Sequence, residues 1–312
     1  MRRRTAALVG LVAVLGWRCG ATGEGGRAGS TGRGTIVIGS KLDTEAQLLA
    51  RLMAVQLKGQ GYPVRTKIPL GGTGIVRKAL TSKKIDVYWE FTGTGLNLVG
   101  QKPIGDPEAA YARVKELDAA RGVTWLPAAR LNDTYALAVR DGGPVGARSL
   151  SEFGAELRTE PAGRLCVDPE GGFRDDVLPR LRTAYGIVFQ NTTQLDHDLV
   201  PAAVAAGRCV AGVVYSTTAL IVKNGLRVLA DDRRAFGAYT PAPTVLTRRL
   251  PRWPHLADDL AGLTAALDTP TITRLNARVD VDKKTPEEVA RDFLVTRGLI
   301  SAPAGNKGAS GR

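Results

Sequence analysis

The feature that most constrains the fold is a strict alternation of short apolar runs with segments of helical periodicity, which begins at Thr35. Short apolar runs that end in small residues are typical of buried strands. The expected strands are 36–40, 64–68 and 85–91, and the expected helices are 44–61 and 71–80. Thr44 and Gln47 fit a capping box at the first helix. This order predicts a parallel sheet with helices on both faces, which places a ligand beyond the carboxyl ends of the strands.

The same order of elements returns in the second half of the chain. Further strands are expected at 165–168, 188–190, 210–215 and 226–230, and further helices at 176–185, 199–206, 217–224 and 286–297. The apolar segment 134–139 leads into this second set, and the segment 228–244 leads back. We therefore predict an α/β protein of two lobes, residues 35–134 with 240–300 and residues 135–239. Two crossing segments would join the lobes around a ligand cleft, as in hinged binding proteins.

The N-terminus has the pattern of an export signal in residues 1–18. Three arginines precede an apolar run from Ala6 to Leu15, which is shorter than the roughly 20 residues that a membrane-spanning helix needs. A flexible tether is expected over residues 19–34, and a loose tail over 301–312. Two alternatives remain for Cys19: a lipid anchor after cleavage, or an ordinary cleaved signal, since Trp17 and Arg18 stand where lipoprotein signals usually carry small residues. In either case we expect the protein to be periplasmic or anchored to the outer face of the cell membrane.

Two further cysteines, Cys166 and Cys209, lie in or next to strand-like runs. Export permits disulfide formation. If the two strands are neighbours, the sulfurs can meet in a disulfide; the alternative is two separately buried thiols.

The formal net charge is +13, and removal of residues 1–18 leaves +9 because that segment holds four arginines and no acidic residue. The lysines and arginines are scattered and lack interleaved aromatic residues, so the pattern does not indicate nucleic-acid binding. A solvated basic surface near an anionic membrane is expected instead.

Motifs for enzyme chemistry are missing from the sequence. The glycines at 71–74 are not followed by the Gly-Lys-Ser/Thr of a P-loop. No Gly-x-Ser-x-Gly elbow occurs, and the two histidines, His197 and His255, are not at metal-ligand spacing. We therefore expect neither a catalytic site nor a cofactor or metal. The enzymatic alternative would have to use Asp133 or Glu90 as an acid or base.

Aromatic residues are scarce, at 5% of the chain, yet several fall at expected cleft edges. These are Phe91, Tyr135, Tyr215 and Tyr239. Aromatic faces attract cations that cannot donate hydrogen bonds, such as a trimethylammonium group. A ligand with a carboxylate at its other end would also need donors. The donors expected near the cleft are Lys41, Thr94 and Arg174.

Several blocks of the sequence resemble the glycine betaine/choline-binding proteins of ABC importers. These blocks are Ile36-Val-Ile-Gly-Ser-Lys41, Leu70-Gly-Gly-Thr73, Ile85-Asp-Val-Tyr-Trp-Glu-Phe-Thr-Gly-Thr94, Asn132-Asp-Thr-Tyr-Ala136, Val214-Tyr-Ser-Thr217, Leu275-Asn276 with Val279-Asp280, and 286–294. The resemblance runs from about Thr35 to Ile300. It implies a type II periplasmic-binding-protein fold. It also implies a monomer that binds a small quaternary ammonium ligand and delivers it to a membrane permease.

The resemblance also implies roles for individual residues. Its aromatic cage falls on the four aromatic residues named above, and its carboxylate-binding roles fall on Lys41, Thr94 and Arg174. Asp133 is expected to offset ligand charge at the cage. The family usually has Tyr where this chain has Phe91, which keeps the ring face and loses the hydroxyl. Two alternatives stay open. The first is a protein of the same fold that binds a different small solute, such as an amino acid or a polyamine. The second, which is less favoured, is a ligand-sensing module of the kind fused to a permease or kinase.

Overall fold

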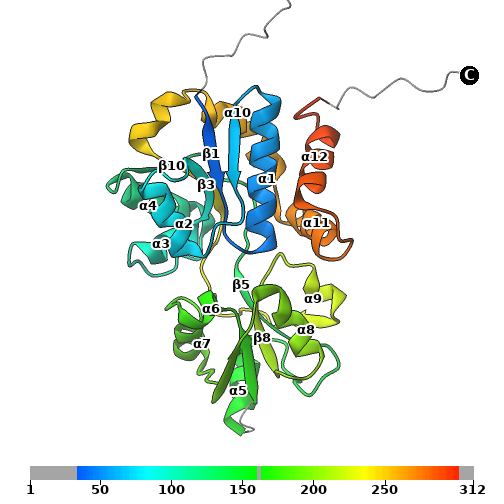
Figure 1. Ribbon diagram of the computed structural model, residues 1–312. Helices are drawn as coiled ribbons and strands as arrows, with labels where there is room; N and C mark the ends of the chain where they lie inside the picture. The colour runs from blue at the N-terminus through cyan, green and yellow to red at the C-terminus, as the bar shows by residue number, and fades with distance from the viewer. Residues whose placement is uncertain (1–33, 160–162, 302–312) are drawn as a thin grey trace, which may run out of the picture. The chain divides into compact units, whose positions relative to one another are not determined.

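The computed structural model describes residues 34–159 and 163–301. The predicted export signal at 1–18, Cys19, the tether up to residue 33 and the tail from residue 302 lie outside the described residues. Within the described ranges the chain forms two five-stranded sheets, each surrounded by helices (Figure 1). No helix among the described residues is long and apolar enough to cross a membrane.

The first sheet has the strand order β2-β1-β3-β10-β4. Its strands are β1 (Ile36–Gly39), β2 (Val64–Lys67), β3 (Val87–Phe91), β4 (Val123–Trp125) and β10 (Pro241–Leu246). The first three strands are parallel, as the alternating pattern predicts. However, β10 runs antiparallel to both β3 and β4, so the sheet is mixed and not wholly parallel as expected. The reason is that the returning segment enters the sheet as a strand and pairs Pro241 with Phe91.

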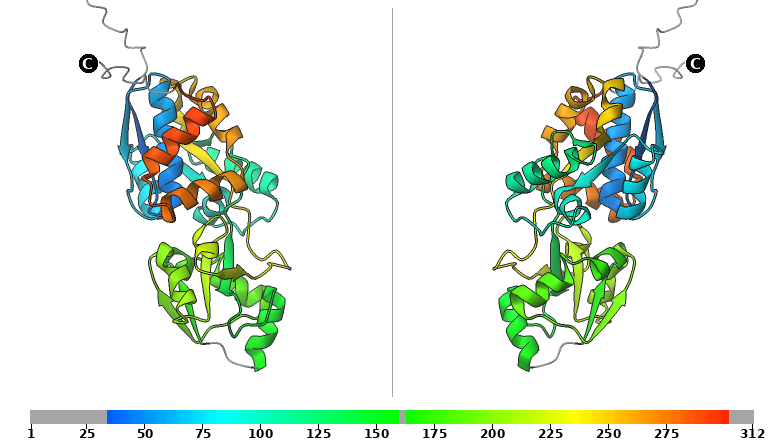
Figure 2. Two further views of the ribbon diagram at one scale, coloured as in Figure 1. Left: turned by 90° about the vertical axis from the view of Figure 1, so that its right-hand side faces the viewer. Right: turned by 90° about the vertical axis from the view of Figure 1, so that its left-hand side faces the viewer.

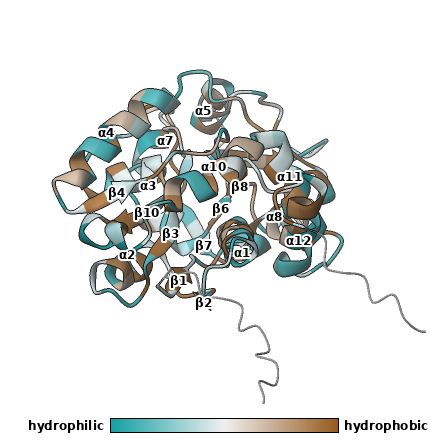
Figure 3. Cartoon of the chain, turned by 90° about the horizontal axis from the view of Figure 1, so that it is seen from above, coloured by the Kyte–Doolittle hydropathy of each residue, from teal (hydrophilic) through white to brown (hydrophobic). Residues whose placement is uncertain are grey.

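Helices cover both faces of the first sheet. They are α1 (Thr44–Gly59), α2 (Thr73–Thr81), α3 (Thr92–Leu98), α4 (Pro107–Ala119), α10 (Leu256–Ala266), α11 (Thr269–Asp280) and α12 (Pro286–Thr296), with a 3-10 helix η2 (Thr247–Arg252). The C-terminal α12 lies beside α1, although the two are far apart in the sequence (Figures 1 and 2). Seen from above, the helices carry both hydrophilic and hydrophobic residues, as expected of helices that pack on one side only (Figure 3).

The start of α1 differs from the predicted capping box. Asp43, and not Thr44, is the N-cap, and its carboxylate accepts a hydrogen bond from the Ala46 N–H at 2.8 Å. Thr44 Oγ1 instead donates to Asp280 of α11 at 2.8 Å, and Gln47 donates to the Leu42 carbonyl. The expected helix is present, with its cap one residue earlier than predicted. The Asp43 carboxyl group lies in the loop between β1 and α1.

The second sheet has the strand order β7-β6-β8-β5-β9. Its strands are β5 (Tyr135–Arg140), β6 (Arg164–Val167), β7 (Asn191–Gln194), β8 (Ala211–Tyr215) and β9 (Leu226–Val228). Its helices are α5 (Leu150–Thr159), α6 (Pro169–Phe173), α7 (Leu178–Tyr185), η1 (His197–Leu199), α8 (Val200–Ala205) and α9 (Leu220–Lys223). The strand predicted at 188–190 is wrong, because the chain joins the sheet only at Asn191. In this sheet β6, β7 and β8 are parallel, whereas β5 is antiparallel to β8 and β9.

A disulfide bond joins Cys166 of β6 to Cys209, which lies just before β8. The two strands are neighbours in the sheet, and the Cα atoms of the cysteines are 5.7 Å apart. Both cysteines are buried. The bond therefore closes a long loop, which carries α6, α7, β7 and α8, at the centre of the second sheet.

Candidate functional site

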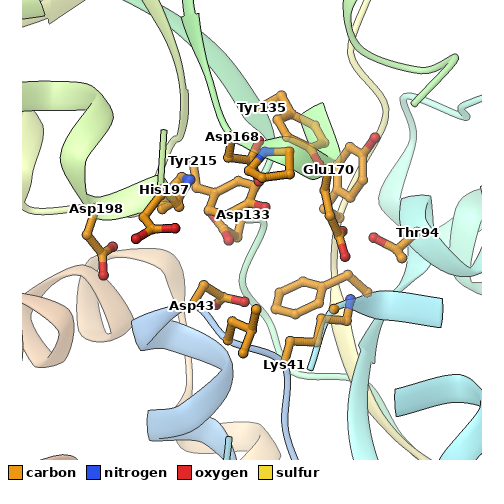
Figure 4. A pocket seen from close by; sticks show the side chains of 16 residues that line it. Lys41, Asp43, Thr94, Asp133, Tyr135, Asp168, Glu170, His197, Asp198 and Tyr215 are labelled. Atoms are coloured by element: carbon orange, nitrogen blue, oxygen red, sulfur yellow. The ribbon is translucent and has the colours of Figure 1, made fainter. Parts of the chain in front are cut away.

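The strand ends of both sheets border one cavity of about 480 Å³ (Figure 4). From the first sheet come the loop after β1, the end of β3 and the start of α3. From the second come the start of β5, the segment from β6 into α6, η1 and the end of β8. The lining residues are Lys41, Leu42, Asp43, Gly72, Phe91, Thr94, Asp133, Tyr135, Asp168, Pro169, Glu170, Asp196, His197, Asp198, Tyr215 and Tyr239. All the ligand-contacting residues expected from the sequence are among them except Arg174.

Three tyrosines form one wall of the cavity. Tyr135 opens β5 and pairs with Tyr215, the last residue of β8, so the strand register sets their rings 5.2 Å apart. The Tyr239 ring stands perpendicular to Tyr135 at 5.3 Å, and its hydroxyl donates to Asp176 at 2.6 Å. Burial raises the pKa of all three phenols, so the rings are neutral at physiological pH.

The Thr-Gly-Thr segment after Phe91 has a packing reason in the structure. A Cβ atom on Gly93 would lie 2.5 Å from the Tyr239 ring, so only glycine lets that ring approach the start of α3. Thr92 helps to fix the same crossing, since its hydroxyl donates to the Ala238 carbonyl at 2.8 Å. The segment therefore positions Tyr239 against the first sheet and leaves Thr94 facing the cavity.

His197 is a cavity residue that the sequence reasoning did not assign to the site. Its imidazole stacks on the Tyr215 ring with centroids 3.9 Å apart. Burial lowers the pKa of His197 to about 4, so the imidazole is neutral at physiological pH. It can therefore support the Tyr215 ring without adding a positive charge beside it. It lies shortly after the end of β7, but the sequence placed that strand at 188–190 and so gave no signal for it.

Lys41 reaches the cavity as half of a buried ion pair. Its Nζ lies 2.5 Å from Oε1 of Glu90, which is fully buried, and 5.0 Å from the centre of the Phe91 ring. Glu90 also accepts hydrogen bonds from the Tyr88 hydroxyl at 2.8 Å and the Phe91 N–H at 2.9 Å. A buried charge requires such partners. The pair leaves Lys41 with donor capacity toward the cavity but with most of its charge offset.

Arg174 lies behind the tyrosine wall and not in the lining. Its guanidinium sits 5.6 Å from the Tyr135 ring centre and 5.7 Å from that of Tyr239. Nε donates to Asp176 at 2.7 Å, and Nη1 donates to the Thr94 hydroxyl oxygen at 3.2 Å. Because Thr94 accepts this bond, its own hydroxyl hydrogen is free to be donated toward the cavity.

Carboxyl groups make up the rest of the polar lining, and most were not assigned to the site from the sequence. They are Asp43, Asp133, Asp168, Glu170, Asp196 and Asp198. Burial raises the pKa of Asp43, and it raises those of Asp168 and Asp198 to about 6. Asp43 and Asp168 are also the N-caps of α1 and α6, whereas the sequence placed the first cap at Thr44 and Asp168 in a strand. Despite this acidity, no group of three metal-ligating side chains occurs in residues 34–159 and 163–301.

Asp133 shares one hydroxyl group with a second buried carboxyl group. Thr217 Oγ1 lies 2.7 Å from Asp133 Oδ1 and 2.5 Å from Glu45 Oε2, and Asn276 donates to the same Glu45 oxygen at 2.8 Å. A hydroxyl has a single hydrogen to donate. Both contacts are satisfied when one of the two carboxyl groups is protonated and donates to Oγ1. Burial accounts for this, because it raises the pKa of Glu45 strongly and that of Asp133 to about 7.

Comparison with known proteins matches residues 34–296 to the family described as the substrate binding domain of ABC-type glycine betaine transport systems. The chain is 35% identical to a glycine-betaine-binding protein of Pseudomonas aeruginosa over 289 residues, which is 88% of this chain and 92% of that one. It is 31% identical to the glycine betaine-binding protein YehZ of Escherichia coli, covering 84% and 90% of the two chains.

A solved structure, the apo form of Escherichia coli YehZ, superimposes with a TM-score of 0.64 at 30% identity, covering 85% of this chain and 99% of that one. The fold is thus the two-lobed α/β fold of substrate-binding proteins. The family match and the two relatives cover nearly all the described residues. This chain therefore belongs to the family of substrate-binding domains of ABC-type glycine betaine transport systems.

Proposed function

We propose that this protein captures a quaternary ammonium compound, such as glycine betaine, choline or a related betaine, in the cavity described above. The observation that carries the proposal is the group of aromatic rings at the cavity, Phe91, Tyr135, Tyr215 and Tyr239. A desolvated cation held against such faces gains up to about 2 kcal/mol per contact. A quaternary ammonium group donates no N–H hydrogen bonds, so ring faces suit it better than the polar groups that bind ordinary amines.

The surrounding carboxyl groups support the same proposal, because they complement the positive charge of the ligand. Asp133 stands two residues before Tyr135 and lines the cavity beside the cage. For the other end of a betaine, Lys41 and Thr94 are the donors that face the cavity. Arg174 would act on that end through Thr94, since its guanidinium holds the threonine oxygen.

Delivery of the ligand to an ABC permease is the role that the family supports, and we propose that the protein acts as an exported monomer without catalysis. Both acids of the enzymatic alternative are already engaged, Glu90 by Lys41 and Asp133 by Thr217. Residues 1–18 would direct export, and the mass of the mature N-terminus would distinguish a lipid on Cys19 from an ordinary cleaved end.

A polyamine is the second candidate ligand, and the acidic lining favours it. Primary ammonium groups would donate hydrogen bonds to Asp43, Asp168 and Asp198. The two candidates differ in what they need from the rings. Titration with spermidine and putrescine in competition with choline separates them, since a polyamine site would bind these amines at least as tightly as choline.

Binding of a quaternary ammonium ligand should strengthen as the pH rises from about 6 to 8. The pKa of Asp133 is about 7 in the free protein, and a bound cation favours the ionised carboxylate and so lowers that pKa. Binding then releases a proton, and affinity rises with pH until it levels off above the pKa of the free protein. A pKa lowered by one unit corresponds to about tenfold in affinity.

Calorimetric titrations at pH 6.5 in buffers of different ionisation enthalpy would measure this proton release directly. Asp168 and Asp198 titrate near pH 6, so they also contribute to the pH dependence at the acidic end of this range. The matched control that isolates Asp133 is Asp133→Asn, which should make the affinity nearly independent of pH between about 6.5 and 8. An unchanged affinity from pH 6 to 8 in the unmodified protein would show that Asp133 does not sense the ligand.

A further inference from the structure

Glu170, at the start of the second sheet's α6, caps a helix of the other sheet. Its Oε1 accepts a hydrogen bond from the Thr73 N–H at 2.6 Å, and its Oε2 accepts one from the Thr73 hydroxyl at 2.9 Å. The N-cap residue of α2 is Gly72, which supplies no side-chain cap of its own. The N-terminus of a helix attracts anions, and here a carboxylate of the protein already satisfies it.

Arg174 also lies near Glu170. Nη1 of Arg174 lies 4.0 Å from Glu170 Oε2 and also holds the Thr94 hydroxyl oxygen. Although burial works in the opposite direction, the charge of Lys41 and the hydrogen bonds from Thr73 lower the pKa of Glu170, so it is ionised at physiological pH. Lys41, Thr94 and Arg174 are the residues that the sequence assigns to a ligand carboxylate.

Glu170 is also a lining residue of the cavity, so it is within reach of a bound ligand (Figure 4). A ligand carboxylate placed among these donors would meet the negative charge of Glu170 and would have to compete for the Thr73 N–H. A ligand that ends in a hydroxyl group meets neither obstacle, and it can donate a hydrogen bond to a carboxylate.

We propose that Glu170 is a built-in carboxylate that occupies the anion-binding end of the cavity and thereby selects quaternary ammonium alcohols of the choline type over carboxylate-bearing betaines. This inference rests on the proposed function. It makes Glu170 a specificity-determining residue of the site. The other lining residues offer little positive charge to a ligand carboxylate. Among the described residues that line this cavity, Lys41 is the one lysine or arginine, and it is paired with Glu90.

The test compares the dissociation constants of choline and glycine betaine for the full-length protein and its Glu170→Gln and Glu170→Ala variants. The unmodified protein should bind choline more tightly. In Glu170→Ala the Thr73 N–H and hydroxyl lose their partner, and the ratio of the two constants should shift toward betaine by about tenfold or more, as expected when a ligand carboxylate gains a charge-assisted hydrogen bond. Glu170→Gln, which keeps the shape and loses the charge, should shift the ratio in the same direction by less.

The ratio also separates selection from other effects of Glu170. Loss of a contact between α6 and α2, or a smaller folded fraction, changes both constants alike and cancels in the ratio. Asp196→Asn is the matched control, because it removes one negative charge from the lining without touching Thr73 or Arg174, and its ratio should move less than about threefold.

A ratio that stays within about threefold of the unmodified value in both Glu170 variants would overturn the inference while leaving the proposed function intact. A preference of the unmodified protein for glycine betaine would overturn it as well. If neither compound binds any of the proteins, the proposed function itself fails, and the inference falls with it.

Discussion

Replacement of Tyr135 by leucine is expected to weaken the binding of a quaternary ammonium ligand by about 30-fold, or roughly 2 kcal/mol. Tyr135 is the central ring of the cavity wall, 5.2 Å from the Tyr215 ring and 5.3 Å from the Tyr239 ring. Leucine preserves an apolar side chain in this buried position and removes the ring face. The loss therefore reports on cation–π attraction, and calorimetric titration with choline or glycine betaine measures it.

The matched control for this prediction is Tyr135→Phe, which keeps the ring and removes only the hydroxyl group. It should bind within about threefold of the unmodified protein. Thermal unfolding of both variants would verify that they are folded. Equal affinities of the folded Leu and Phe variants would mean that the ring face does not hold the ligand.

Loss of the Cys166–Cys209 disulfide is expected to lower the free energy of unfolding by about 4 kcal/mol. The cysteines are 43 positions apart, and closing a loop of that length restricts the unfolded chain by about this amount in the chain-entropy description. Urea denaturation of the oxidised protein and of the Cys166→Ala/Cys209→Ala double variant would measure the difference.

The oxidised protein treated with a reductant provides the control, because reduction breaks the bond without changing a side chain. The reduced protein and the double variant should lose similar stability, and both should still bind ligand while folded, since neither cysteine lines the cavity. A loss below about 1 kcal/mol in the reduced protein would contradict the prediction.

The sequence predicted the α/β class and the regular elements where local periodicity determines them. The β1-α1-β2-α2-β3 order could be read from residues 36–91 because each strand is a short apolar run and each helix has its own stripe. The antiparallel position of β10 could not be read from the sequence. Its first residue, Pro241, pairs with Phe91 some 150 positions earlier, and no local pattern indicates that pairing.

The aromatic residues of the cavity could be predicted because they stand at strand ends, where the fold itself makes a cleft. The acidic lining, apart from Asp133, could not. Asp43 and Asp168 are helix caps in the structure, and their place in the cavity depends on where α1 and α6 meet it. Arg174 was assigned to the ligand from its loop, whereas its contact with Asp176 turns it to the rear of the tyrosines.

Glu170 illustrates a further limit of sequence reasoning. Nothing near it in the chain indicates that its carboxylate caps α2, because Thr73 is 97 positions away. Only the meeting of α6 and α2 shows that the N-terminus of α2 already has a carboxylate partner in the protein.

The most direct test of the proposed function is isothermal titration of the purified protein with glycine betaine and choline, each paired with its unmethylated counterpart, glycine and ethanolamine. Each pair differs only in the methyl groups on nitrogen, which are what the aromatic rings would recognise. We predict saturable binding at one site for at least one methylated compound and no measurable binding of either counterpart. Binding of glycine or ethanolamine as tight as that of its methylated partner, or no binding of any of the four, would contradict the account.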